Sequence, residues 1–358
     1  MKRRYELDVI RSFAFLMIFV FHFNMMILQD GIEIPFSLIV KTKSQTLGQL
    51  GVGLFLILSG FVLVSSFERT GKKPIPFYLK RLLAIFPLFY ACYFVAYLWI
   101  DLPAGHLFSK NMVWTLFGFD GFLSARGITT SYRVGEWYLG VILIYYLLFP
   151  ALFCLIKKHP WFTGAAILGL YSVFTVFYPF SYLPDVSPIV RLPEFAFGIY
   201  IALYYKKESL PLALAGGVMF LLLTFIEFPG YQMHGTLIAT ISLFLCMYTV
   251  FRCIAGLRKK VSAPGNVFPR IIFTISKYSF SMFLLHHIVQ EQLFKPHIGN
   301  TVSAFKYFAY FIYCLFITLL IAYLVQNGTE TIVRKIRSRL KKAPATQEPE
   351  TDQTSINT

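Results

Sequence analysis

Residues 7–28 read LDVIRSFAFLMIFVFHFNMMIL and predict a membrane-spanning helix, because they form an apolar run long enough to cross a bilayer. Asp8, Arg11 and His22 lie within this run. An ionisable group at bilayer depth costs several kcal/mol, so such residues mark candidate functional sites. Arg11 and His22 are eleven positions apart, which places them within about 20° of one helix face and roughly 16 Å apart along it. The pattern predicts a channel with a cation at its mouth and an imidazole deep inside.

The overall composition is that of a membrane protein. Hydrophobic residues make up 57% of the 358 residues and charged residues only 14%. The net charge of +16 does not indicate nucleic-acid binding, because the basic residues lie in short clusters between apolar runs, where membrane topology places them. The five cysteines form neither a CxxC pair nor a CxxC…H pattern, so no disulfide framework and no metal site is expected.

Apolar windows of about 20 residues predict an all-α polytopic membrane protein with about ten transmembrane helices. The expected spans are 7–28, 48–67, 82–100, 137–156, 161–179, 191–205, 210–228, 235–254, 271–291 and 305–326. If the N-terminus is cytoplasmic, the inward-facing segments hold most of the 33 basic residues, so both termini are expected in the cytoplasm. Residues 1–330 are expected to form the membrane domain, and residues 331–358 a basic and then disordered cytoplasmic tail.

The first span is expected to remain in the protein, because it is too long for the apolar region of a signal peptide and holds Asp8 and Arg11.

The segments outside these spans are short. In the longest outer segment, residues 106–119 (HLFSKNMVWTLFGF) are expected to lie flat as an interfacial helix. No segment is long enough for a separate soluble domain.

Six sequence blocks occur in order over residues 5–325. They are LDVIRSFAFLMIFVFH (7–22), GVGLFLILSGFVL (51–63), FYLKRLLAIFP (77–87), WYLGVILIYYLLFP (137–150), RLPEFAFGIY (191–200) and SKYSFSMFLLHH (276–287). In these blocks the chain resembles the integral-membrane acyltransferase-3 family, as a stand-alone member without the hydrolase-like domain that some members carry. The resemblance implies a ten-helix enzyme that moves an acetyl or other short acyl group from cytoplasmic acyl-CoA to a sugar hydroxyl.

The resemblance also implies the partners and the location. Acetyl-CoA or another acyl-CoA is expected as donor substrate, with no permanently bound cofactor. Surface polysaccharides or their lipid-linked precursors are the expected acceptors, and membrane lipid and glycan-assembly proteins are further candidate partners. The expected location is the cytoplasmic membrane of a bacterium.

Two positions depart from the family's pattern. Many members carry a second arginine three residues after the position of Arg81, where this chain has Ala84. Many also carry Ser-x-Glu just after the tryptophan of the fourth block, where this chain has Gly140 and Ile142. Glu136, immediately before that tryptophan, is the candidate replacement for the missing carboxylate and a candidate substrate-binding residue.

Histidines are the candidate catalytic residues. Attack of a sugar hydroxyl on a thioester requires a group that takes the hydroxyl proton, and a neutral imidazole suits this role, so His22 is the candidate general base. The alternative is a histidine that hydrogen-bonds a neighbouring helix. His22 and His286 each lie fifteen residues from the expected cytoplasmic ends of their helices, or about 22 Å, so both are expected at one level. His286 is favoured over its neighbour His287 as the residue that faces the cavity.

Arginines near the cytoplasmic ends are the candidate ligands of CoA. Arg11 is expected to bind its phosphates, because the guanidinium geometry matches phosphate oxygens. The alternative for Arg11 is an ion pair with Asp8, three residues earlier. Arg81, at the expected cytoplasmic start of the third span, has the same candidate role, against plain anchoring at the membrane surface.

Arg191 and Glu194 begin the sixth span from the outer side. As an exposed pair they are candidates to bind a sugar hydroxyl or a polyprenyl-linked phosphate of the acceptor. The alternative is a structural pair at the start of a helix that follows Pro188.

Two other classes of function remain open at this point. A polysaccharide or small-solute transporter would use His22 and Arg11 as a proton-coupled path. Inverted repeats would favour transport, and none is evident. A non-catalytic membrane partner in a glycan-assembly complex is the third possibility.

Overall fold

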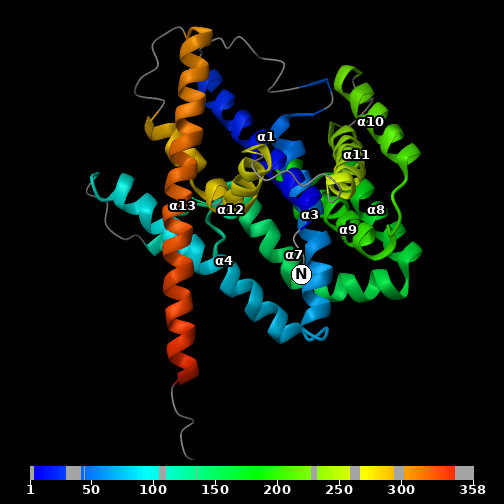
Figure 1. The fold of residues 1–358 in the computed structure, drawn as a ribbon, viewed down its shortest axis with the longest axis horizontal. Helices are drawn as coiled ribbons and strands as arrows, with labels where there is room; N and C mark the ends of the chain where they lie inside the picture. Colours follow the sequence, from blue (N-terminus) through cyan, green and yellow to red (C-terminus); the bar gives the residue numbers. More distant parts are fainter. Residues whose placement is uncertain are drawn as a thin grey trace, which may run out of the picture.

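The computed structural model describes residues 4–29, 42–43, 45–104, 110–134, 136–226, 232–258, 267–293 and 302–342, and the regular elements within these ranges are helical. The long helices are α1 (Tyr5–Gln29), α3 (Leu47–Arg69), α4 (Pro74–Ala96), α7 (Glu136–Lys158), α8 (Pro160–Val176), α9 (Pro188–Tyr204), α10 (Leu210–Phe225), α11 (Gln232–Arg258), α12 (Val267–Leu293) and α13 (Ala304–Lys342) (Figure 1). The short elements are η1 (Tyr97–Asp101), η2 (Lys110–Met112), α5 (Val113–Phe117), α6 (Asp120–Ser124) and η3 (Pro184–Val186).

Each of the ten expected spans coincides with one of these long helices, so the prediction of an all-α polytopic protein is confirmed. Among the described residues, six helices are long and apolar enough to cross a membrane by length and composition, and α8 and α10 are shorter apolar helices. The structure therefore describes a multi-pass membrane protein.

The largest differences from the expected boundaries concern α4, α13 and the segment 106–119. α4 begins at Pro74, eight residues before the expected span, because proline at the first turn fixes a helical φ and needs no hydrogen-bond donor. Arg81 therefore lies within α4 rather than at its start. α13 continues through residue 330 to Lys342, and residues 343–358 lie outside the described residues. Within 106–119, residues 106–109 also lie outside the described part. The described residues up to 117 form η2 and α5 rather than one long helix, and α5 ends at Phe117, just before Gly118, whose φ is +70°.

Two hydrogen bonds join helix ends that are expected on the same side of the membrane, as judged from the distribution of basic residues. At the expected cytoplasmic side, Arg4 donates to the Tyr248 hydroxyl of α11 at 2.6 Å. At the expected outer side, the Tyr307 hydroxyl of α13 donates to Asn24 of α1 at 2.6 Å. Helices that run through the membrane in alternating directions produce this pairing, so the structure agrees with the expected alternation.

The centre of the molecule is the contact between α3 and α9. A Cβ atom added at Gly60 would overlap the carbonyl oxygen of Phe195, and one at Gly198 would overlap that of Ile57. Only glycine lets the two backbones approach this closely, as in other helix pairs within membranes. α1 packs on the same α3, and this core holds the helices that carry the functional side chains.

The edges of the molecule carry exposed apolar side chains. Figure 1 shows α13 along one edge and α8 and α10 at the opposite edge. Phe305 of α13 is 82% exposed and Trp161 of α8 is 91% exposed. In a membrane protein these surfaces face lipid tails.

The outer segment between α4 and α7 packs onto the end of α4. Arg133 pairs with the buried Asp101 of η1 at 2.6 Å, and the Tyr93 hydroxyl donates to the Ser131 carbonyl at 2.9 Å. Asp120, the first residue of α6, is buried beneath this segment. Burial raises the pKa of Asp120 to about 6.

Candidate active site

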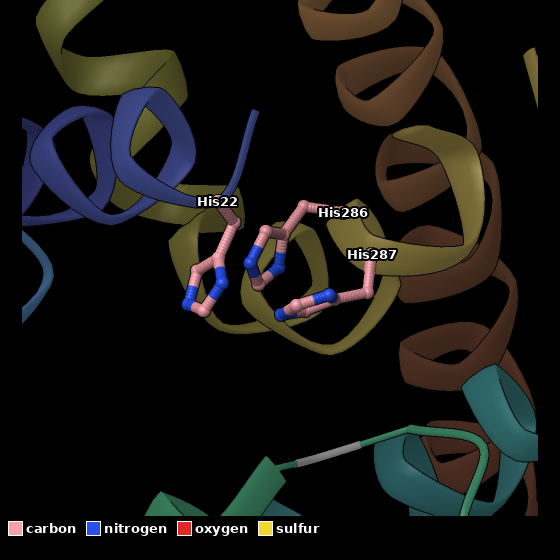
Figure 2. A group of neighbouring side chains, drawn as sticks. All are labelled: His22, His286 and His287. Atoms are coloured by element: carbon pink, nitrogen blue, oxygen red, sulfur yellow. The ribbon is translucent and has the colours of Figure 1, made fainter. Parts of the chain in front are cut away.

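Three histidines from two helices converge in one cluster. His22 comes from α1, and His286 and His287 come from α12 (Figure 2). The ring centroids of His22 and His286 lie 5.2 Å apart, and those of His22 and His287 lie 4.1 Å apart. The prediction that His22 and His286 lie at the same level is therefore confirmed.

The two histidines of α12 have different surroundings. His286 is fully buried and packs its ring near those of Phe15, Phe19 and Phe283. Its Nδ1 lies 2.7 Å from the Phe283 carbonyl oxygen, which only accepts, so Nδ1 carries a proton and Nε2 is the acceptor of the neutral ring. His287 is half-buried and lies nearer to His22. His286 is thus the packed member of the pair, and His287 is the more accessible one; the preference for His286 as the residue that faces the cavity stays a prediction.

The three histidines also form a set of side chains that a metal ion can bind. Within the described chain, the ring nitrogens of these three histidines lie within 4.8 Å of one another. Three imidazoles are a ligand set that Zn²⁺ accepts. The same nitrogens serve proton transfer when no metal occupies them, so the two uses exclude each other.

Arg11 and Arg81 line one cavity of about 250 Å³. Arg11 reaches it from α1 and Arg81 from α4, and residues of α3, α7 and α12 complete the wall. Arg81 donates from Nη2 to the Ser66 hydroxyl at 2.7 Å, which fixes the direction of its guanidinium group. Asp8 accepts a hydrogen bond from Ser276 of α12 at 2.6 Å. The structure thus brings together the two arginines that the sequence assigned to CoA.

Three aromatic side chains, Phe55, Tyr138 and Phe283, line this cavity, and we call them the aromatic collar. The rings of Tyr138 and Phe283 are 5.3 Å apart, and those of Phe55 and Tyr138 are 6.3 Å apart. Phe283 also lies 5.8 Å from the ring of His286. Phe283 thus lines the arginine cavity and also packs against the histidine cluster.

The two departures from the family pattern lie on this cavity. Ala84 and Ile142 both line it. On α7, Ile142 lies between Tyr138 and Tyr146, which are one turn away on either side and line the same cavity. Sequence reasoning did not assign the two tyrosines. Their spacing of four residues from Ile142 is the signal, and it becomes informative only once that position is known to face a cavity.

Arg191 and Glu194 are buried rather than exposed. Their side chains are 2% and 1% exposed, and Arg191 Nε lies 3.1 Å from a Glu194 carboxylate oxygen. Arg191 also donates to the Gln49 carbonyl at 2.9 Å. The expectation of an exposed pair is wrong, because α3 and α11 pack over this part of α9. The side chain of Glu136 lies outside the described residues, so its candidate role stays a prediction.

Comparisons with known proteins show the family to which the chain belongs. A family model described as an acyltransferase domain (Acyl_transf_3) matches residues 4–326. The chain belongs to the acyltransferase-3 family. It is 25% identical to an acyltransferase named MdmB from Streptomyces mycarofaciens over 321 residues, which cover 79% of this chain and 78% of that protein. No solved structure matches the chain. The protein is thus a multi-pass membrane acyltransferase, and this favours the transferase over the proton-coupled transporter.

Proposed function

We propose that the protein transfers an acetyl or other short acyl group from acyl-CoA to a hydroxyl group of an extracytoplasmic or lipid-linked carbohydrate. The proposed location is the cytoplasmic membrane of a bacterium, with both chain termini in the cytoplasm. The observation that carries this proposal is the arginine cavity, which is lined by Arg11 and Arg81 and also by Phe283, whose ring lies 5.8 Å from that of His286 in the histidine cluster. A donor with phosphates at one end and a thioester at the other matches this order of groups.

The donor would bind through its phosphates. The guanidinium groups of Arg11 and Arg81 offer paired donors that fit phosphate oxygens, and a site away from bulk water strengthens such contacts. Arg11 and His22 are separated by roughly 16 Å along α1, as three helical turns dictate. The thioester arm would extend along this face, past the collar, toward the histidines.

The histidines would supply the acid–base chemistry. The acceptor hydroxyl oxygen attacks the thioester carbonyl carbon, the carbon–sulfur bond breaks, and the hydroxyl proton passes to the His22 imidazole. The departing CoA thiolate then takes this proton from the His22 imidazolium, which restores the neutral base. His286 is held by the Phe283 carbonyl, and its Nε2 remains an acceptor next to His22. An imidazole without a metal is the base that this step needs.

Mass spectrometry of surface glycans tests the proposal. Cells with the gene should carry acyl groups that are absent from deletion cells and from cells that express His22→Ala protein. The protein level of that variant in membranes serves as the control for folding. Glycans with identical acylation in all three strains would contradict the proposed acceptor class.

A further inference from the structure

A second hollow lies beside the arginine cavity, in a groove between α4 and α13. Figure 1 shows that these two helices cross, and they pack against each other. The groove has a volume of about 580 Å³. Leu83, Pro87 and Leu88 of α4 give it an apolar side, and α13 gives it a polar side. We call it the α4–α13 groove.

Ala84 joins the two hollows, because it lines both the arginine cavity and the α4–α13 groove. Its neighbours on α4 divide between them, with Arg81 on the cavity and Lys80 on the groove. A methyl side chain at this position leaves the wall between the hollows thin. A ligand bound in one of them can therefore extend into the other past Ala84.

The size of the arginine cavity calls for such an extension. Pockets that hold drug-sized ligands have volumes of roughly 300–1,000 Å³. The arginine cavity, at about 250 Å³, is below this range, whereas the groove, at about 580 Å³, is within it. A whole acyl-CoA, with its nucleotide and its long thioester arm, does not fit the cavity alone.

The charges of the groove suit an anion. Lys80 and Arg334 both line it, and both side chains are exposed to water. One carboxylate, that of Glu330, lines the same groove and accepts a hydrogen bond from Gln326 at 2.9 Å. With two cations and one anion, these groove residues carry a net positive charge. The groove lies toward the end of α13 that is expected in the cytoplasm from the distribution of basic residues.

We propose that the α4–α13 groove holds the nucleotide end of the acyl-CoA donor, with Lys80 and Arg334 as contacts for its 3′-phosphate. The diphosphate that joins the nucleotide to the thioester arm lies past Ala84 in the arginine cavity, where Arg11 and Arg81 hold it. This inference rests on the proposed function and adds a second donor subsite to it. Glu330 opposes the bound anion and limits its affinity.

Binding of CoA and of 3′-dephospho-CoA to the full-length purified protein tests the inference. Arg334→Ala and Lys80→Ala should each weaken CoA binding by about three- to tenfold, as expected for loss of one charge-assisted phosphate contact. The same variants should weaken the binding of CoA more than that of 3′-dephospho-CoA, because dephospho-CoA lacks the nucleotide phosphate that these two cations contact. Glu330→Gln should strengthen CoA binding.

Lys335→Ala is the matched control, because Lys335 is an exposed cation next to Arg334 that does not line the groove. This variant should bind both compounds as the wild type does. A second arm of the experiment uses nanodiscs with and without phosphatidylglycerol. It measures CoA binding and lipid retention by each variant, since a lipid headgroup offers the same phosphate chemistry.

The outcomes separate the inference from the proposed function. If the wild type binds and uses acyl-CoA while the Arg334 and Lys80 variants match the Lys335 control, the groove is not a donor subsite and the proposed function stands. An effect of these variants on anionic-lipid retention alone would also overturn the inference. A wild-type protein that binds no acyl-CoA at all would overturn both.

Discussion

His22 of α1 and His287 of α12 lie with their ring centroids 4.1 Å apart, although most of the chain separates them in sequence. They meet because α1 and α12 pack along each other. A general base needs an imidazole nitrogen that accepts a proton, and nitrogens of these two rings lie within 4.8 Å of each other, so the contact bears directly on the proposed catalysis.

Replacement of His22 by alanine should abolish acyl transfer without unfolding the protein. Loss of one general base typically lowers the rate by about 10²–10⁴. Turnover of acyl-CoA by purified protein measures the effect. His234→Ala is the control, because His234 lies on α11 beside Tyr171 and outside the histidine cluster, and it should keep wild-type turnover. Wild-type turnover by His22→Ala would remove His22 from the mechanism.

Substitutions of Arg11 and Arg81 should act on the donor rather than on the acceptor. Arg11→Ala and Arg81→Ala should raise the KM for acyl-CoA by about tenfold or more, because each removes a phosphate contact of a guanidinium group. Arg11→Lys should recover only part of this loss, since a point charge does not reproduce paired donors. Steady-state kinetics with each substrate varied in turn separates the two effects. Unchanged KM for acyl-CoA in both alanine variants would place the donor elsewhere.

A methyl group at Gly198 should destabilise the centre of the molecule. An added Cβ overlaps the Ile57 carbonyl oxygen, so α3 and α9 must move apart. Overpacking of this kind typically costs about 1–3 kcal/mol, and thermal unfolding in detergent should show a lower Tm for Gly198→Ala. Gly169→Ala is the matched control, because a Cβ there meets nothing within 4 Å. Equal Tm values for the two variants would argue against the close contact of α3 and α9.

The stability of the outer segment should fall as the pH rises. Because the pKa of Asp120 is about 6 in the folded protein, against an ordinary value of 3.8, the folded state binds more protons between these values. Unfolding therefore becomes easier through this window as the carboxyl ionises. Asp120→Asn should raise the Tm at pH 7.5 and change it little at pH 4. A variant that is equally stabilised at both pH values would contradict this explanation.

The sequence predicted the helices well and the packing of single side chains less well. Apolar runs placed the ten long helices of the described residues, because the bilayer demands both length and hydrophobicity. They did not place helix ends, so the early start of α4 and the length of α13 were missed. The periodicity of α1 related Arg11 to His22 because both lie on one helix.

Other features depend on contacts between helices that are distant in sequence. His286 and His287 are adjacent and differ by about 100° around α12, and only the position of α1 decides which of them lies nearer to His22. In the same way, spacing predicted the Arg191–Glu194 pair, but its burial depends on α3 and α11. The arginine cavity needs five helices, and no single stretch of sequence contains its signal.

The most direct test of the central claim is an assay of reconstituted protein with labelled acetyl-CoA on the side that corresponds to the cytoplasm. The account predicts that label passes to a glycan acceptor, or that free CoA is released slowly by hydrolysis, without any imposed pH gradient. The His22→Ala protein should show neither. Absence of acetyl-CoA binding, together with glycan movement driven by a pH gradient, would contradict the account.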